Sequence, residues 1–171
     1  MDAKTAIRMF HKSQLVRDVH VPDKLVIPAK LFGGTIDCAG CHFTHVSAVC
    51  AYLENHVRFV ECQFDYLDLY ATYFLKGLIM EQCAVVDRVV FQSGGHNDDS
   101  LISISDTRFE SFVDFEDCWF TGPVRLHNVT FNQGTNLLGN KNTPMAVSFD
   151  IEPELVNVLG DLAIDTYNPK T

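Results

Sequence analysis

The residues with the clearest chemical potential lie in one short string, CAGCHFTH, from Cys38 to His45. Cys-x-x-Cys-His is the attachment signature of c-type haem, in which the thiols bond the porphyrin and the histidine ligates iron. The thiols of Cys38 and Cys41 and the imidazoles of His42 and His45 are also a possible set of four zinc ligands. We favour a third interpretation, in which the cysteines are small core residues, because Cys41 falls at an inward position of the repeat described below. We therefore expect no metal and no cofactor.

Two other groups of residues could support acid–base chemistry. Asp114, Glu116 and Asp117 form a carboxylate cluster of the kind that polysaccharide-cleaving β-helix enzymes carry on an outer face. The segment from Gln92 to Ser100, QSGGHNDDS, places His96 beside two aspartates, but one turn-rich loop rarely builds a site by itself. The chain has no G-x-S-x-G, no Walker loop, no G-x-G-x-x-G and no H-E-x-x-H. A small carbohydrate-active or metal-dependent enzyme is therefore the alternative, and a non-catalytic interaction protein is the main hypothesis.

The element that must position these residues repeats every five positions. Apolar residues recur at that interval through the middle of the chain, at Phe59, Phe64, Leu69, Phe74, Ile79, Ala84 and Val89. A helix face repeats every 3.6 residues and a strand face every 2.0, so neither explains this period. A chain that lays down a short extended segment, turns a corner and repeats does explain it.

Small or apolar residues also stand two places before many of these positions. A second tract carries apolar pairs of the same form, whose second members advance by five or six residues: Ile102/Ile104, Thr107/Phe109, Val113/Phe115, Cys118/Phe120, Val124/Leu126 and Val129/Phe131. Upstream, Cys41/Phe43, Val46/Ala48 and Ala51/Leu53 continue the pattern, and one inserted residue brings it to Val57/Phe59. About ninety residues thus predict one solenoid, in which each repeat buries its apolar face against its neighbours.

The tract VRFVECQFDYLDLYATYFLKGLIM resembles the pentapeptide-repeat proteins, whose loose consensus is a small residue, any residue, then Leu or Phe at the centre of each five. The resemblance covers residues from about Thr35 to Leu137. It implies an all-β solenoid, a right-handed, four-sided parallel β-helix, with central residues such as Phe59 and Phe64 stacked in its interior. Gln82, Asp87 and the six-residue steps depart from the consensus and indicate bulged corners.

A single domain with helical caps is expected around this solenoid. We expect residues 1–34 to form an N-terminal cap with an amphipathic helix at residues 3–17, residues 35–138 to form the β-helix, and residues 139–171 to add a strand and a helix that Pro153 opens. The chain has no apolar run long enough to span a membrane and no apolar stretch typical of a signal peptide. We therefore expect a cytoplasmic protein with free thiols.

Acidic residues are concentrated in the middle of the chain. From Glu54 to Asp117 there are thirteen acidic and four basic residues, and the difference of nine equals the formal net charge of −9. Some pentapeptide-repeat proteins imitate duplex DNA and occupy the DNA site of topoisomerases, so the resemblance implies a DNA mimic as one form of interaction protein. We expect a protein partner here and no direct binding of nucleic acid.

Outward positions in the central tract are unexpectedly apolar. If Leu69 and each fifth residue after it point inward, the residue directly after each of them should point outward. These residues are Tyr70, Leu75, Met80, Val85 and Val90. Such a row would form a partner interface, of which a homodimer contact is the simplest version. The predicted partner-binding residues are therefore Asp65, Asp68, Tyr70, Leu75, Met80, Val85, Asp114, Glu116 and Asp117.

Overall fold

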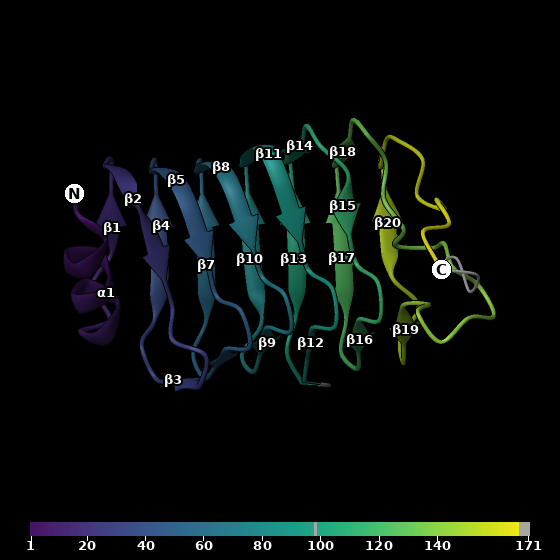
Figure 1. Cartoon of the computed structure of the whole chain (residues 1–171), viewed down its shortest axis with the longest axis horizontal. Coiled ribbons are helices and arrows are strands. Elements are labelled where there is room, and N and C mark those ends of the chain that lie inside the picture. The colour runs from purple at the N-terminus through teal and green to yellow at the C-terminus, as the bar shows by residue number, and fades with distance from the viewer. Residues whose placement is uncertain (98, 168–171) are drawn as a thin grey trace.

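The chain winds into a parallel β-helix in which each coil lies against the preceding one (Figure 1). The computed structural model describes residues 1–97 and 99–167. Its strands pair in parallel with strands of the neighbouring coils and form three lengthwise sheets, which we name sheets A, B and C. The predicted all-β solenoid is confirmed.

Sheet A is the longest flat face and contains one strand from every coil. Its seven strands, in spatial order, are β1 (Val16–Arg17), β4 (Ile36–Ala39), β7 (Val57–Val60), β10 (Leu78–Glu81), β13 (Ile102–Ser105), β17 (Val124–His127) and β20 (Glu154–Val156).

Sheet B is bent along its length. Its main path contains β2 (His20–Val26), β5 (His42–Ser47), β8 (Gln63–Asp68), β11 (Ala84–Val90), β14 (Arg108–Phe109) and β18 (Thr130–Phe131), while β15 (Val113–Asp114) pairs with β11. Phe64 and Leu67 of β8 are both buried although they lie three residues apart, which a flat strand with a period of two does not allow. The bend therefore divides sheet B into two faces, and the coil has four sides.

Sheet C consists of strands of two residues each. They are β3 (Leu31–Phe32), β6 (Tyr52–Leu53), β9 (Tyr73–Phe74), β12 (Gly95–His96), β16 (Trp119–Phe120) and β19 (Ser148–Phe149). The second residue of β6, β9, β12 and β16 is buried and the first residue of each faces outward, except that Gly95 of β12 is also buried.

Each side of a coil contributes two inward residues separated by one outward residue. In the third coil these pairs are Val57/Phe59, Cys62/Phe64, Leu67/Leu69 and Thr72/Phe74, and all eight residues are buried. Equivalent rings stack between coils, as in Phe43 on Phe64, whose centroids lie 5.4 Å apart. Stacked aromatic pairs add about 0.5–1.5 kcal/mol each beyond the area they bury. The predicted interior positions of Phe59, Phe64, Leu69 and Phe74 are therefore confirmed.

The predicted register fails by one residue after Phe74. Met80 is 0% exposed whereas Ile79 is 37% exposed, so the inward and outward assignments of these two residues were reversed. Val85 is likewise fully buried where an outward position was predicted.

A corner insertion causes this slip. Four sides of five residues would give a coil of 20 residues. Val57 pairs with Ile36 in the preceding coil and with Leu78 in the following coil, so each of these coils takes 21 residues. The extra residue falls at the corner that Gly77 closes with a φ of +89°. A Cβ there would lie 2.3 Å from the carbonyl oxygen of Leu101, so this position requires glycine.

The two ends of the solenoid differ from each other and from the prediction. Helix α1 (Ala3–His11) begins after the N-cap Asp2 and lies at the N-terminal end of the coil, with Phe10 buried (Figure 1). It is shorter than the helix predicted for residues 3–17, because the chain has already entered β1 at Val16. The C-terminal helix predicted after Pro153 is wrong: residues 154–156 form β20, which pairs with β17, and residues 153–162, all described, contain no helix.

The one-residue slip leads to a direct test by paired substitutions. We expect Met80→Ala to lower the free energy of unfolding by about 2–5 kcal/mol, because it leaves a cavity in the interior stack. We expect Ile79→Ala, its neighbour on the outer face, to change that energy by less than about 0.5–1 kcal/mol. Urea unfolding followed by circular dichroism measures both, and equal losses would contradict the observed register.

Candidate interaction surfaces

The corner between sheets A and B carries a column of exposed residues in the left-handed conformation. One residue from each coil occupies it, with φ between +49° and +62°: Asp18, Gly40, Glu61, Gln82, Asp106, Asn128 and Asn157. From Asp18 to Asn128, each column residue donates its backbone N–H to a carbonyl oxygen in the next coil. The acceptor is the residue directly before the next column residue, as when Asp18 donates to Ala39, which precedes Gly40. The column therefore projects its side chains at regular intervals, and none of the seven is basic.

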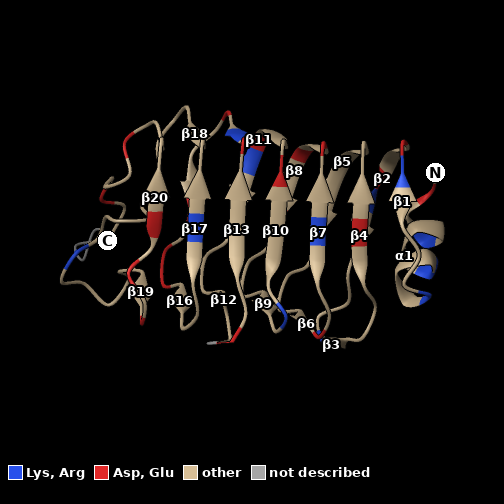
Figure 2. Ribbon diagram, turned by 180° about the vertical axis from the view of Figure 1, so that it is seen from behind, with Lys and Arg blue, Asp and Glu red and all other residues tan. Residues whose placement is uncertain are grey.

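We name Asp18, Glu61, Glu81 and Asp106 the acidic edge. Glu81 ends β10 directly before the column. Figure 2 shows these acidic positions along the margin where the arrows of sheet A end. The broad face of sheet A has mixed charge instead, because Asp37 pairs with Arg58 and Glu154 with Arg125 and His127.

The predicted acidic residues form a second row on the other side of sheet B. Asp68 and Asp114 both pair with Val90, so they share one outward column and lie two strands apart. Glu116 and Asp117 follow at the next corner, where Asp117 has a φ of +57°. Burial raises the pKa of the Glu116 carboxyl above its ordinary value, and the nearby carboxylates of Asp114 and Asp117 add to the increase.

These four residues, Asp68, Asp114, Glu116 and Asp117, are the second acidic row. All four accept hydrogen bonds, of which two come from side-chain amides: Oδ1 of Asp114 accepts from Asn136 Nδ2 at 2.8 Å, and Oε2 of Glu116 accepts from Gln92 Nε2 at 2.9 Å. Asp65, also predicted to bind a partner, is separate from this row, because His42 Nε2 lies 2.9 Å from its Oδ1.

The predicted apolar interface does not exist as one surface. Met80 and Val85 are interior residues for the reason given above, and Val90 is buried as well. Tyr70 is exposed and Leu75 is half-buried, so only these two members of the row reach the surface. The homodimer contact predicted from this row therefore has no continuous apolar surface.

The CAGCHFTH string does not bring its four candidate ligands together. Cys38 and Cys41 are buried in the interior, whereas His42 and His45 extend from the outer face of β5. His42 stacks on His20 at 4.6 Å, and His45 packs against Tyr66 at 4.4 Å. Among the described residues, no three His, Cys, Asp or Glu side chains are grouped so that they could hold a metal ion.

The buried thiols of Cys38, Cys41 and Cys118 are weaker acids than an exposed thiol. Cys41 donates to the carbonyl oxygen of Ala39 at 3.3 Å, and Cys118 donates to that of Phe91 at 3.1 Å. Desolvation by burial raises the pKa of Cys118 to about 12 and that of Cys38 well above its ordinary value. These cysteines therefore act as small core residues, which agrees with the interpretation favoured from the sequence.

His96 is an interior residue and was not predicted to be one. It occupies the place in sheet C that Phe74 and Phe120 hold in the adjacent coils, and it is 3% exposed. Its Nε2 lies 3.2 Å from the carbonyl oxygen of Pro123, and its Nδ1 is buried without a hydrogen-bond partner. Burial lowers the pKa of this imidazole below its ordinary value of 6.5.

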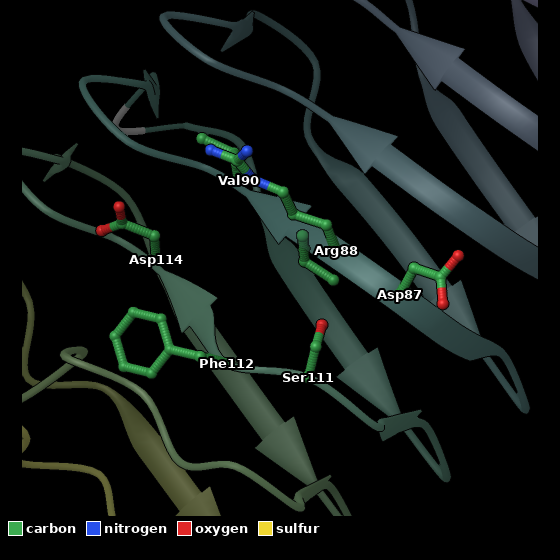
Figure 3. Close-up of a pocket in the computed structure, with 7 residues that line it drawn as sticks. Asp87, Arg88, Val90, Ser111, Phe112 and Asp114 are labelled. Carbon is green, nitrogen blue, oxygen red and sulfur yellow. The ribbon is translucent and has the colours of Figure 1, made fainter.

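A hollow of about 300 Å³ lies on the outer face of sheet B beside the bend (Figure 3). Asp87 and Asp114 stand at opposite ends of it, and Arg88, Ser111 and Phe112 lie between them. Arg88 also lies over the ring of Tyr66, 5.9 Å from its centroid. The hollow therefore places a cation and an aromatic side chain between the carboxylates and does not bring the two acids together.

Comparison with protein-family models, with curated proteins and with solved structures finds no match. Among the described residues, no helix is both long enough and apolar enough to cross a membrane.

Sequence reasoning missed the acidic edge, although the sequence contains a signal for it. Asp18, Gly40, Glu61 and Gln82 follow one another at intervals of 21 or 22 residues. Once the coil length is known, this interval aligns the corner residues of successive coils. Gly, Asn and Asp adopt the left-handed conformation most readily, and these types recur in the column.

The exposure of the thiols can be tested by chemical modification. Cys50 is exposed and the other five cysteines are buried. We expect a thiol-specific reagent to modify one thiol rapidly in the native protein, and all six after unfolding in urea. The Cys50→Ser variant should lack the rapid phase. Rapid modification of Cys38 or Cys41 in the native protein would contradict their interior position.

The buried imidazole of His96 should make stability depend on pH. Because the folded pKa lies below the unfolded value of about 6.5, the unfolded chain binds the proton more tightly. The contribution of neutral His96 to the free energy of unfolding is fully present above pH 6.5. It is lost as the pH falls, by at most about 1.4 kcal/mol per pH unit. We expect His96→Phe to reduce this decline between pH 6.5 and 5, measured by urea unfolding.

The exposed His56 is the matched control for this experiment. We expect His56→Gln to retain the full pH dependence of the native protein. If the free energy of unfolding of His96→Phe falls with pH as steeply as that of the native protein, other groups cause the pH dependence.

Proposed function

We propose that the chain is a degenerate pentapeptide-repeat protein that acts without catalysis, by presenting an acidic surface to a basic protein partner. Inward pairs such as Val57/Phe59 and Cys62/Phe64, which advance in five-residue steps, support the family assignment. The four-sided coil supports it as well, because the family resemblance implies that cross-section.

The observation that carries the proposal is the presence of two acidic rows, one on each side of sheet B. The acidic edge precedes the strands of sheet B, and the second acidic row follows at their far ends. Glu61 of the acidic edge and Asp68 of the second acidic row are seven residues apart, so their backbones are at most about 23 Å apart. Two parallel negative rows are also what the phosphate backbones of duplex DNA present to a protein. The partner is therefore a protein with a basic, DNA-binding cleft.

The spacing of the charges sets the expected strength of this interaction. Glu61 and Asp106 lie two strand spacings apart in the column, about 9.6 Å, whereas duplex DNA carries one charge per about 1.7 Å of its axis. The acidic rows thus produce a weaker field than DNA does. Binding should depend on long-range attraction that salt screens, with a Debye length of about 10 Å at 0.1 M.

Plasmid supercoiling by a type II topoisomerase tests the proposal, because it requires the enzyme's DNA site to be free. We expect the native protein to inhibit supercoiling at low salt and to lose this effect as the salt concentration rises. The double variant Glu61→Gln/Asp106→Asn removes two charges from the acidic edge at nearly constant shape, and we expect it to need about tenfold more protein for the same inhibition.

The matched control removes two charges from sheet A, which has mixed charge. We expect Asp37→Asn/Glu154→Gln to inhibit as the native protein does. If the native protein leaves supercoiling unchanged at low salt, or if both double variants lose the same activity, the acidic rows are not a DNA-like binding surface.

A further inference from the structure

The outer face of sheet C carries a column of large side chains interrupted by a glycine. The strand register aligns one residue from each coil, in the order Leu31, Tyr52, Tyr73, Gly95, Trp119 and Ser148. Tyr52 and Tyr73 stack with centroids 5.2 Å apart and planes 8° from parallel. These strands lie along the edge of the molecule that labels β6, β9, β12 and β16 mark in Figure 2.

Gly95 carries no side chain between two aromatic residues of the column. The backbones at Tyr73 and Trp119 are two strand spacings apart, about 9.6 Å, because each pairs with Gly95 from one side. The ring of Tyr73 leans over Gly95, which is buried: a Cβ at Gly95 would lie 3.4 Å from Cε1 of Tyr73. A hollow of about 330 Å³ lies here and is lined by Tyr73, His96, Asn97, Trp119, Thr121 and Asp150. A Cβ at Gly95 would lie 2.2 Å from the carbonyl oxygen of Trp119, so the backbone itself excludes a side chain at this position.

Both aromatic side chains are held in place before any ligand binds. Trp119 is 56% exposed, yet its Nε1 donates to Oδ1 of Asp150 at 3.1 Å, which limits rotation of the indole. Tyr73 is supported from behind by Tyr52. A ligand that enters the hollow therefore meets two fixed aromatic side chains, and little side-chain freedom is lost on binding.

Two fixed aromatic side chains beside the hollow favour a ligand ring that presents C–H groups. A pyranose chair presents C–H groups on both faces, which suit the electron-rich faces of aromatic rings.

The polar groups and the charge of the hollow narrow the ligand class further. Asn97 Nδ2 donates to the carbonyl oxygen of Leu75, and Thr121 Oγ1 donates to that of His96. The side-chain oxygens of Asn97 and Thr121, and Oδ2 of Asp150, are the acceptors that suit the hydroxyls around such a ring. The net charge of −9 and the carboxylate of Asp150 repel phosphates and acidic sugars. The ligand that fits is thus an uncharged sugar.

We propose that the hollow between Tyr73 and Trp119 binds a neutral pyranose residue of a glycan; we name it the aromatic slot. A linear glycan that leaves the slot can continue along the column over Tyr52, which is 46% exposed. The slot lies on sheet C, and the residues that line it belong to neither acidic row, so this inference does not depend on the proposed protein partner.

The chain offers a built-in reporter for this site, because Trp119 is its only tryptophan. The experiment titrates the native protein with neutral hexasaccharides of the cello-, manno-, xylo- and maltooligosaccharide series and follows indole emission. We expect a saturable change with at least one series. Tyr73→Ala should raise the Kd for that series at least tenfold, whereas Tyr70→Ala, which removes an exposed tyrosine outside the slot, should leave it unchanged.

Calorimetry with the same oligosaccharide measures Trp119→Ala, which lacks the fluorescent reporter. We expect no detectable binding by this variant, while its far-UV circular dichroism matches that of the native protein. Two further titrations use adenosine and an oligogalacturonate, and we expect neither to saturate the signal. No saturable change with any neutral series, equal binding by Tyr73→Ala, or saturation by adenosine or oligogalacturonate instead of the neutral series would each overturn the proposal.

Discussion

The hydrogen-bonded register between successive coils is the constraint on which the rest of this structure depends. Each backbone N–H and C=O in a strand must find its partner one coil away, because an unpaired group in the wall of the coil would cost free energy. Coils of 21 to 29 residues satisfy this requirement by absorbing extra residues at corners, which leaves the faces aligned. Equivalent side chains therefore stack, as Phe109 does on Phe131 at 5.2 Å.

The sequence predicted the faces of this solenoid better than its corners. A buried position demands an apolar side chain, so Phe59 and Phe64 reveal it through their type. A corner insertion leaves no such mark, because Ile79 and Met80 are both apolar and either could face inward. Gly77 was the local hint, since its positive φ closes the longer corner.

The C-terminal segment and His96 were misread for a related reason, which is that tertiary pairing overrides local pattern. Leu155, Val158 and Leu162 have the spacing of a helix face, but the exposed edge of β17 offers unpaired backbone groups, and β20 pairs with them instead. Gly160, at a φ of +114°, also suits a turn more than a helix. His96 was assigned to a polar loop by its neighbours, whereas its coil position made it an interior residue.

The outer columns can differ in function because the coil register positions them independently of their chemistry. Part of the acidity of the corner between sheets A and B is structural, since Asp and Asn tolerate the left-handed conformation better than most residues. Glu61 and Gln82 have no such preference, so their presence in the column at +52° and +53° points to a requirement for polar surface. The acidic edge and the aromatic slot lie along opposite long margins of the molecule (Figure 2). Because the two surfaces share no residue, occupancy of one should leave the affinity of the other unchanged.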